Sequence, residues 1–141
     1  MRREVVHMTV KMMFANLAVK DLKQSMEFFS KLGFEFNPQF TNDLAASMVI
    51  GDNMFAMLLT HDHFKNFTKK EIADATSTTE SIIALAVNSR EEVNTYVEKA
   101  IEAGGKEPMK AQDHGFMYQR SIEDLDGHIW EFFYMDESTI K

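Results

Sequence analysis

The most chemically informative stretch of the sequence is Asp124-Leu-Asp-Gly-His-Ile-Trp-Glu131, because it ends in a carboxylate set among aromatic and aliphatic residues. In a strand, alternate side chains point to opposite faces. The strand predicted here has two apolar faces, with Ile129, Glu131 and Phe133 on one and Trp130, Phe132 and Tyr134 on the other.

A carboxylate on such a strand carries a desolvation cost unless a cation or a proton compensates for its charge. Two roles for Glu131 therefore remain open. It is either a general acid or base in a pocket, or half of a structural ion pair with Arg120 on the neighbouring strand.

The histidines offer a second kind of chemistry. His61 and His63 are two residues apart and, together with His114, could bind a metal ion. Paired histidines in an acidic surface loop are more often solvated, and we expect solvated side chains here. His7 belongs to an N-terminal extension, and His128 follows a glycine in a turn, where we expect it to be exposed.

The elements that must position these groups follow one order twice. Residues 11–19 read as an apolar strand, after which Asp21 and Gln24 form a capping box for a helix that ends at Gly33. Two more apolar runs, 45–50 and 54–60, flank a Gly-Asp-Asn hairpin signal.

The second copy begins with an apolar run at 81–87, and Ser89 and Glu92 cap the helix that follows it. Two further strands, 115–122 and 128–135, are separated by an Asp-Gly turn signal. The repetition predicts one domain, 1–141, made of two strand–helix–three-strand modules at about 11–65 and 81–136. Residues 66–80 are predicted to be a helical connector, because Thr68 and Glu71 resemble a capping box.

The composition excludes several classes of function. The chain of 141 residues has no cysteine, which excludes disulfides, thiolate metal sites and a cysteine nucleophile and suits the reducing cytoplasm, our expected location. Its net charge of −7 and lack of a basic stripe argue against nucleic-acid binding. No apolar run is long enough for a signal peptide or a membrane span. Twelve Phe and eleven Met suggest a soft core, an adaptable apolar pocket or, in part, a homodimer interface.

The duplication, together with Asn16-Leu-Ala-Val-Lys-Asp-Leu and the motif ending at Glu131, resembles the vicinal-oxygen-chelate superfamily of glyoxalases, bleomycin resistance proteins and extradiol dioxygenases. Leu125 stands where that family's Asp-Pro-Asp-Gly motif has proline. The resemblance covers about residues 11–135. It implies an α+β fold of two tandem βαβββ modules, whose curled mixed sheets surround a shared cleft.

The resemblance also implies where a metal ion would bind: one ligand from the first and one from the last strand of each module. Phe14 and Ile82 fall at two of these positions, and residues 54–60 offer no carboxylate or imidazole. Only Glu131 matches a ligand, so we expect no cofactor, with a divalent metal ion as the alternative.

Two functions remain as hypotheses. The first is metal-independent binding of a small apolar or aromatic molecule in the cleft. The second is a lyase or isomerase of the lactoylglutathione lyase type that uses Glu131 as general base or metal ligand. The side chains predicted to line the cleft are Phe14, Asn16, Leu58, Ile82, Ala84 and Phe133. Either Met117 or Tyr118 joins them from the strand opposite Glu131, because the sequence leaves the register after Gly115 open.

Overall fold

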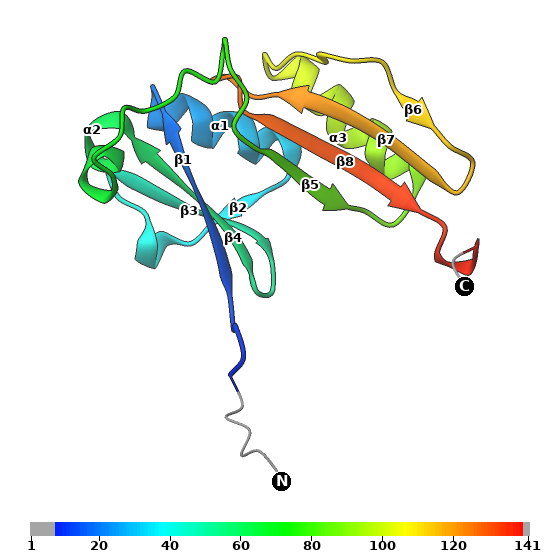
Figure 1. Cartoon of the computed structure of the whole chain (residues 1–141), viewed down its shortest axis with the longest axis horizontal. Coiled ribbons are helices and arrows are strands. Elements are labelled where there is room, and N and C mark those ends of the chain that lie inside the picture. The colour runs from blue at the N-terminus through cyan, green and yellow to red at the C-terminus, as the bar shows by residue number, and fades with distance from the viewer. Residues whose placement is uncertain (1–7, 140–141) are drawn as a thin grey trace, which may run out of the picture.

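The computed structural model describes residues 8–139, so His7 lies outside the described residues. Two modules follow one another along the chain (Figure 1). The first consists of β1 (Met13–Val19), α1 (Leu22–Leu32), β2 (Glu35–Phe36), β3 (Ala45–Gly51) and β4 (Met54–Thr60). The second consists of β5 (Ile82–Ala86), α3 (Arg90–Glu102), β6 (Gln112–Asp113), β7 (Met117–Glu123) and β8 (Ile129–Met135). The short helical segments are η1 (Pro38–Phe40), α2 (His61–Phe64), η2 (Lys65–Phe67) and η3 (Glu137–Thr139).

Each module builds one mixed sheet of four strands. The strand order is β1-β4-β3-β2 in the first sheet and β5-β8-β7-β6 in the second. In both sheets the first strand runs parallel to the last, and the other neighbours are antiparallel. The predicted α+β class and the predicted duplication are therefore confirmed.

Helices α1 and α3 begin where the sequence indicates, and α1 ends at the predicted glycine. The Asp21 carboxylate accepts a hydrogen bond from the amide of Gln24, and Gly33 ends α1 with a φ of 106°, a conformation that suits glycine. In the second module, the Ser89 hydroxyl accepts from the amide of Glu92 at the start of α3.

The hydrophobic core lies between the helices and the sheets. Figure 1 shows α1 and α3 side by side, on the same side of the two sheets. Phe29 of α1 packs edge-on against Trp130 of β8, with 5.2 Å between ring centroids, so residues of both modules share one core. Tyr96 of α3 stacks on Phe132 at 4.7 Å.

The connector differs from its prediction. Helical turns occur earlier, at 61–67, and residues 68–80 form turns and irregular backbone. Thr68 accepts a hydrogen bond from the amide of Lys70, two residues on, rather than capping a helix. Asp74 binds the amide and hydroxyl of Thr76, which closes a local turn that competes with helix formation.

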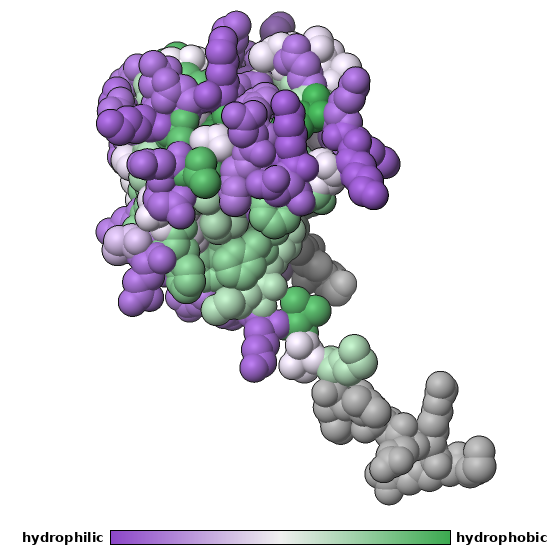
Figure 2. All heavy atoms as spheres, turned by 90° about the vertical axis from the view of Figure 1, so that its left-hand side faces the viewer, coloured by the Kyte–Doolittle hydropathy of each residue, from purple (hydrophilic) through white to green (hydrophobic). Residues whose placement is uncertain are grey.

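Within the part of the chain that the structure describes, no helix layer covers the opposite side of the two sheets, and we call this side the open face. It comprises the strand side chains that point away from α1 and α3. Phe14 and Ile82 on this face are 47% and 52% exposed. Figure 2 shows apolar side chains gathered near the place where the N-terminal segment leaves the body, below a mostly hydrophilic surface. No helix among residues 8–139 is long and apolar enough to cross a membrane.

Candidate functional site

Strand β8 positions Glu131 by burying the residues on either side of it. Trp130 and Phe132 are 0% and 1% exposed and belong to the core, so the side chain of Glu131 points to the open face. Tyr134 packs against the same core, as the predicted alternation requires.

Glu131 lies between two small residues on neighbouring strands. Ala84 of β5 and Ser121 of β7 are its register partners. The side chain is half-buried, and within residues 8–139 no hydrogen bond or ion pair reaches its carboxylate.

The predicted ion pair between Glu131 and Arg120 is wrong. Arg120 pairs in register with Phe132, so its side chain points to the helix side of the sheet. There its guanidinium binds both oxygens of the Glu107 carboxylate at 2.8 and 2.9 Å. The bond to Arg120 lowers the pKa of Glu107.

Several predicted cleft residues share the open face with Glu131. Phe14 stacks on Phe55 of the adjacent strand, with 4.8 Å between ring centroids. The amide of Asn16 donates a long hydrogen bond, 3.4 Å, to the main-chain oxygen of Phe14. The remaining members are Ile82 and Ala84 on β5, Met117 on β7 and Phe133 on β8.

The structure places two predicted lining residues on the other side. Leu58 is fully buried in the core, beside its register partner Leu17. The Tyr118 hydroxyl donates to the Asn94 side chain of α3 at 2.6 Å. Strand alternation therefore leaves Met117, not Tyr118, on the face of Glu131.

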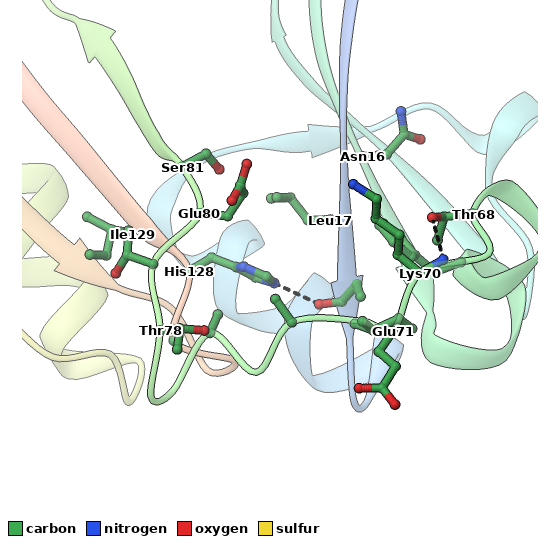
Figure 3. Close-up of a pocket in the computed structure, with 17 residues that line it drawn as sticks. Asn16, Leu17, Thr68, Lys70, Glu71, Thr78, Glu80, Ser81, His128 and Ile129 are labelled. Carbon is green, nitrogen blue, oxygen red and sulfur yellow. Dashed lines mark hydrogen bonds between the residues drawn. The ribbon is translucent and has the colours of Figure 1, made fainter.

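A cavity of about 400 Å³ lies where the two modules and the connector meet, as Figure 3 shows. Three of its residues, Asn16, Ala18 and Ile129, come from the open face. Among the predicted site residues, Asn16 lines the cavity, whereas Phe14, Ile82 and Glu131 lie outside its lining. The rest of the lining comprises Leu17, Phe64, Thr68, Lys70, Glu71, Ile72, Ala73, Ala75, Thr78, Thr79, Glu80, Ser81, Gly127 and His128.

The connector supplies the charged part of this lining. In Figure 3 the Lys70 side chain extends over the cavity towards Asn16, and Glu80 stands on the opposite side. The Glu71 carboxylate points away. These three residues belong to the connector predicted at 66–80, and no local pattern in the sequence indicates that they meet β1.

His128 was expected to be exposed, yet it is half-buried and joins the modules. Its Nε2 donates to the main-chain oxygen of Ala18 at 2.7 Å. The neighbouring Asp126 carboxylate accepts from the amide of Lys20 and the hydroxyl of Ser25. The turn between β7 and β8 thus fixes one wall of the cavity.

Asp124 holds this turn in shape. Its carboxylate accepts from the amides of Asp126 and His128 and from the indole Nε1 of Trp130, at 2.9, 3.0 and 3.0 Å. Burial raises the pKa of Asp124, while the charge of His128 and the bond from Trp130 act in the opposite direction.

The residues at the family's four ligand positions do not fit a divalent metal ion. Phe14 and Ile82 have no donor atom, and the open-face residues of β4 are Phe55, Met57 and Leu59. Glu131 alone remains. Among residues 8–139, no three His, Cys, Asp or Glu side chains are grouped closely enough to hold a metal ion, and this includes His61, His63 and His114.

Comparisons with known proteins agree with this fold. The family model described as Glyoxalase/Bleomycin resistance protein/Dioxygenase superfamily matches residues 5–132. A hypothetical protein from S. aureus has a similar structure, with 33% identity, a TM-score of 0.75, and coverage of 89% of this chain and 95% of that one.

More distant structures share the fold. A genomically encoded fosfomycin resistance protein from Listeria monocytogenes is 20% identical, with a TM-score of 0.64 and coverage of 90% and 92% of the two chains. A glyoxalase-related enzyme from Fulvimarina pelagi is 22% identical, with a TM-score of 0.71 and coverage of 86% and 85%. A search of curated proteins finds no significant match. The match over residues 5–132 shows that the chain belongs to the glyoxalase/bleomycin resistance protein/dioxygenase superfamily.

Proposed function

We propose that this protein binds a small aromatic or apolar molecule without a metal ion, with one end in the cavity and the rest along the open face. The observation that carries this proposal is the cavity itself. Its volume of about 400 Å³ falls in the size range of small-molecule sites. Asn16 of its lining follows the half-exposed Phe14 by two residues on β1, and among residues 8–139 no group of metal ligands accompanies it.

The walls of the cavity suit such a ligand. Leu17, Ile72 and Ile129 are aliphatic, and Asn16 offers an amide that could bond to a carbonyl or hydroxyl group. Beyond the cavity, the stacked rings of Phe14 and Phe55 offer a flat apolar surface. The lack of cysteine is compatible with action in the cytoplasm.

Titration with the neutral fluorescent probe N-phenyl-1-naphthylamine tests the proposal. Saturable binding that survives treatment with EDTA is expected. Lys70→Trp should weaken it at least about tenfold by filling the cavity, because a bulky ring there displaces the ligand. Lys69→Trp is the matched control, since Lys69 is exposed and lies outside the cavity lining. If Lys70→Trp and Lys69→Trp bind the probe equally tightly, the cavity is not the binding site.

One observation favours a second candidate, a lyase or isomerase. The Glu131 carboxylate has no protein partner among residues 8–139, so it is free to accept a proton from a bound substrate. This candidate expects turnover of a substrate such as the hemithioacetal of methylglyoxal and glutathione, and loss of that turnover in Glu131→Gln. Absence of turnover with and without added nickel or zinc would leave the binding function alone.

A further inference from the structure

The charged side chains that the strands place on the open face are all carboxylates. Within the strands of the described chain, Glu35, Glu123 and Glu131 lie on this face by register. Arg120 is the only lysine, arginine or histidine in those strands. It points to the helix side, where Glu107 and Asn94 bind its guanidinium. The open face therefore presents negative charge that the strands do not balance.

Glu131 is the carboxylate best placed to act on a ligand. It lies on the central strand β8 and is half-buried, and its register partners, Ala84 and Ser121, are too small to cover it. A cation brought next to a partly desolvated carboxylate gains more than it would in water, because the effective dielectric constant is lower there. An anion at the same place is repelled.

Aromatic rings on the same face add to this preference. Phe133 follows Glu131 by two residues and shares its side of β8. Phe14 and Phe55 form a stacked pair in the first sheet. The faces of such rings attract cations as well as apolar surface, so a ligand that is both aromatic and positively charged matches both features.

The cavity beside this face has a different character. Its one lysine, Lys70, is accompanied by Glu80 on the opposite side of the cavity, so it does not reverse the charge of the open face. Ile129 lines the cavity and Glu131 is two residues further along β8, about 7 Å away. A molecule anchored beside Ile129 by an uncharged end needs to extend about 7 Å along β8 to bring its other end to Glu131.

We propose that the open face selects aromatic molecules that carry a positive charge, and that Glu131 is the residue that recognises this charge. The inference rests on the proposed binding function and adds the chemical class of the ligand. Glu131 then acts as a specificity determinant and needs no metal ion for that role.

Three probes of similar shape and different charge test the inference: N-methylquinolinium, its neutral counterpart 1-methylnaphthalene, and the anion 1-naphthoate. Equilibrium dialysis with the full chain gives the affinity for each. The wild-type protein is expected to bind the cation at least about tenfold more tightly than the neutral probe, and the anion least. Glu131→Gln should bring the cation down to the affinity of the neutral probe, whose own affinity should not change.

Glu27→Gln is the matched control, because it removes the same charge from an exposed position on α1, on the helix side of the sheets. It should leave the preference for the cation intact. Equal binding of cation and neutral probe by the wild type, or a preference that survives in Glu131→Gln, would overturn the inference while the binding function stands. Failure of all three probes to bind the wild type would overturn the binding function as well.

Discussion

The Nε2 of His128 donates a hydrogen bond of 2.7 Å to the main-chain oxygen of Ala18, which ties the β7–β8 turn of the second module to the first strand. Both residues line the cavity. This contact joins positions 110 residues apart in the sequence and decides how one wall of the cavity is closed.

His128→Ala should lower the free energy of unfolding by about 1 kcal/mol, because one hydrogen bond between the modules is lost. It should also weaken binding of the neutral naphthylamine probe, since a wall of the cavity is released. Urea denaturation and probe titration measure the two effects. His61→Ala, at an exposed position of α2, serves as the control and should change neither.

Asp124→Ala should lower the free energy of unfolding more than His128→Ala does. The indole N–H of Trp130 is fully buried and donates to Asp124, and two main-chain amides of the turn depend on the same carboxylate. The expected loss is about 3 kcal/mol, because buried donors without acceptors carry their full desolvation cost. Asp124→Asn keeps one acceptor oxygen and should lose less. Equal stability of wild type and Asp124→Ala in thermal denaturation would contradict this account.

The Arg90–Asp113 pair gives the protein an acid-sensitive contact. The Arg90 guanidinium binds the Asp113 carboxylate at 2.8 and 3.0 Å. This contact, together with the hydrogen bond from the amide of Gly115, lowers the pKa of Asp113 from 3.8 to about 2. Because the pKa is lower in the folded protein, the stabilisation is fully present above pH 3.8 and is lost as the pH falls towards 2.

Asp113→Asn should accordingly be less stable than the wild type at neutral pH. This difference in stability should shrink as the pH falls from 3.8 towards 2. Denaturation curves recorded at successive pH values measure it. Both side chains are substantially exposed, so added salt should also reduce the difference. A difference that is constant with pH would show that Asp113 contributes in another way.

Alanine substitutions of Leu58 and Ile82 test which side of each sheet faces the core. Leu58 is fully buried and Ile82 is 52% exposed. Leu58→Ala should lower the free energy of unfolding by about 2–5 kcal/mol, because it leaves a cavity in the core. Ile82→Ala should change it by no more than about 0.5 kcal/mol. The reverse order would show that the open face has been assigned to the wrong side.

We propose that the protein forms a homodimer through the exposed end of the first sheet. Strand β1 is an edge strand, and Met13 and Met54, register partners at its beginning, are 65% and 50% exposed. Light scattering should give about twice the chain mass of 16.2 kDa at micromolar concentration. The double variant Met13→Lys and Met54→Lys should be monomeric. Met109→Lys, at a position 61% exposed in a loop, should not change the mass.

Local patterns in the sequence determined the elements and their order. The capping residues Asp21 and Ser89, the terminating Gly33 and the two hairpin turns act through neighbours a few residues away, so they can be read from one chain. The period-two pattern around Glu131 likewise separated its side of β8 from that of Trp130 and Phe132. Because both sides are apolar, only the structure shows that Trp130 and Phe132 are the pair in the core. The shortage of metal ligands followed from residue types at the positions that the family resemblance marks.

Only the tertiary structure determined which residues of neighbouring strands and helices face each other. The partner of Arg120 is Glu107 rather than Glu131, because the β7–β8 register sets Ser121 beside Glu131. The choice of Met117 over Tyr118, and the place of Leu58 in the core, depend on where each strand begins, and sequence patterns fix such boundaries only to within a few residues.

The connector reaches the cavity for a similar reason. Lys70 and Glu80 lie there because an irregular backbone, shaped by the turns at Thr68 and Asp74, passes over β1. Such a path is set by packing between distant segments and leaves no periodic trace in the sequence.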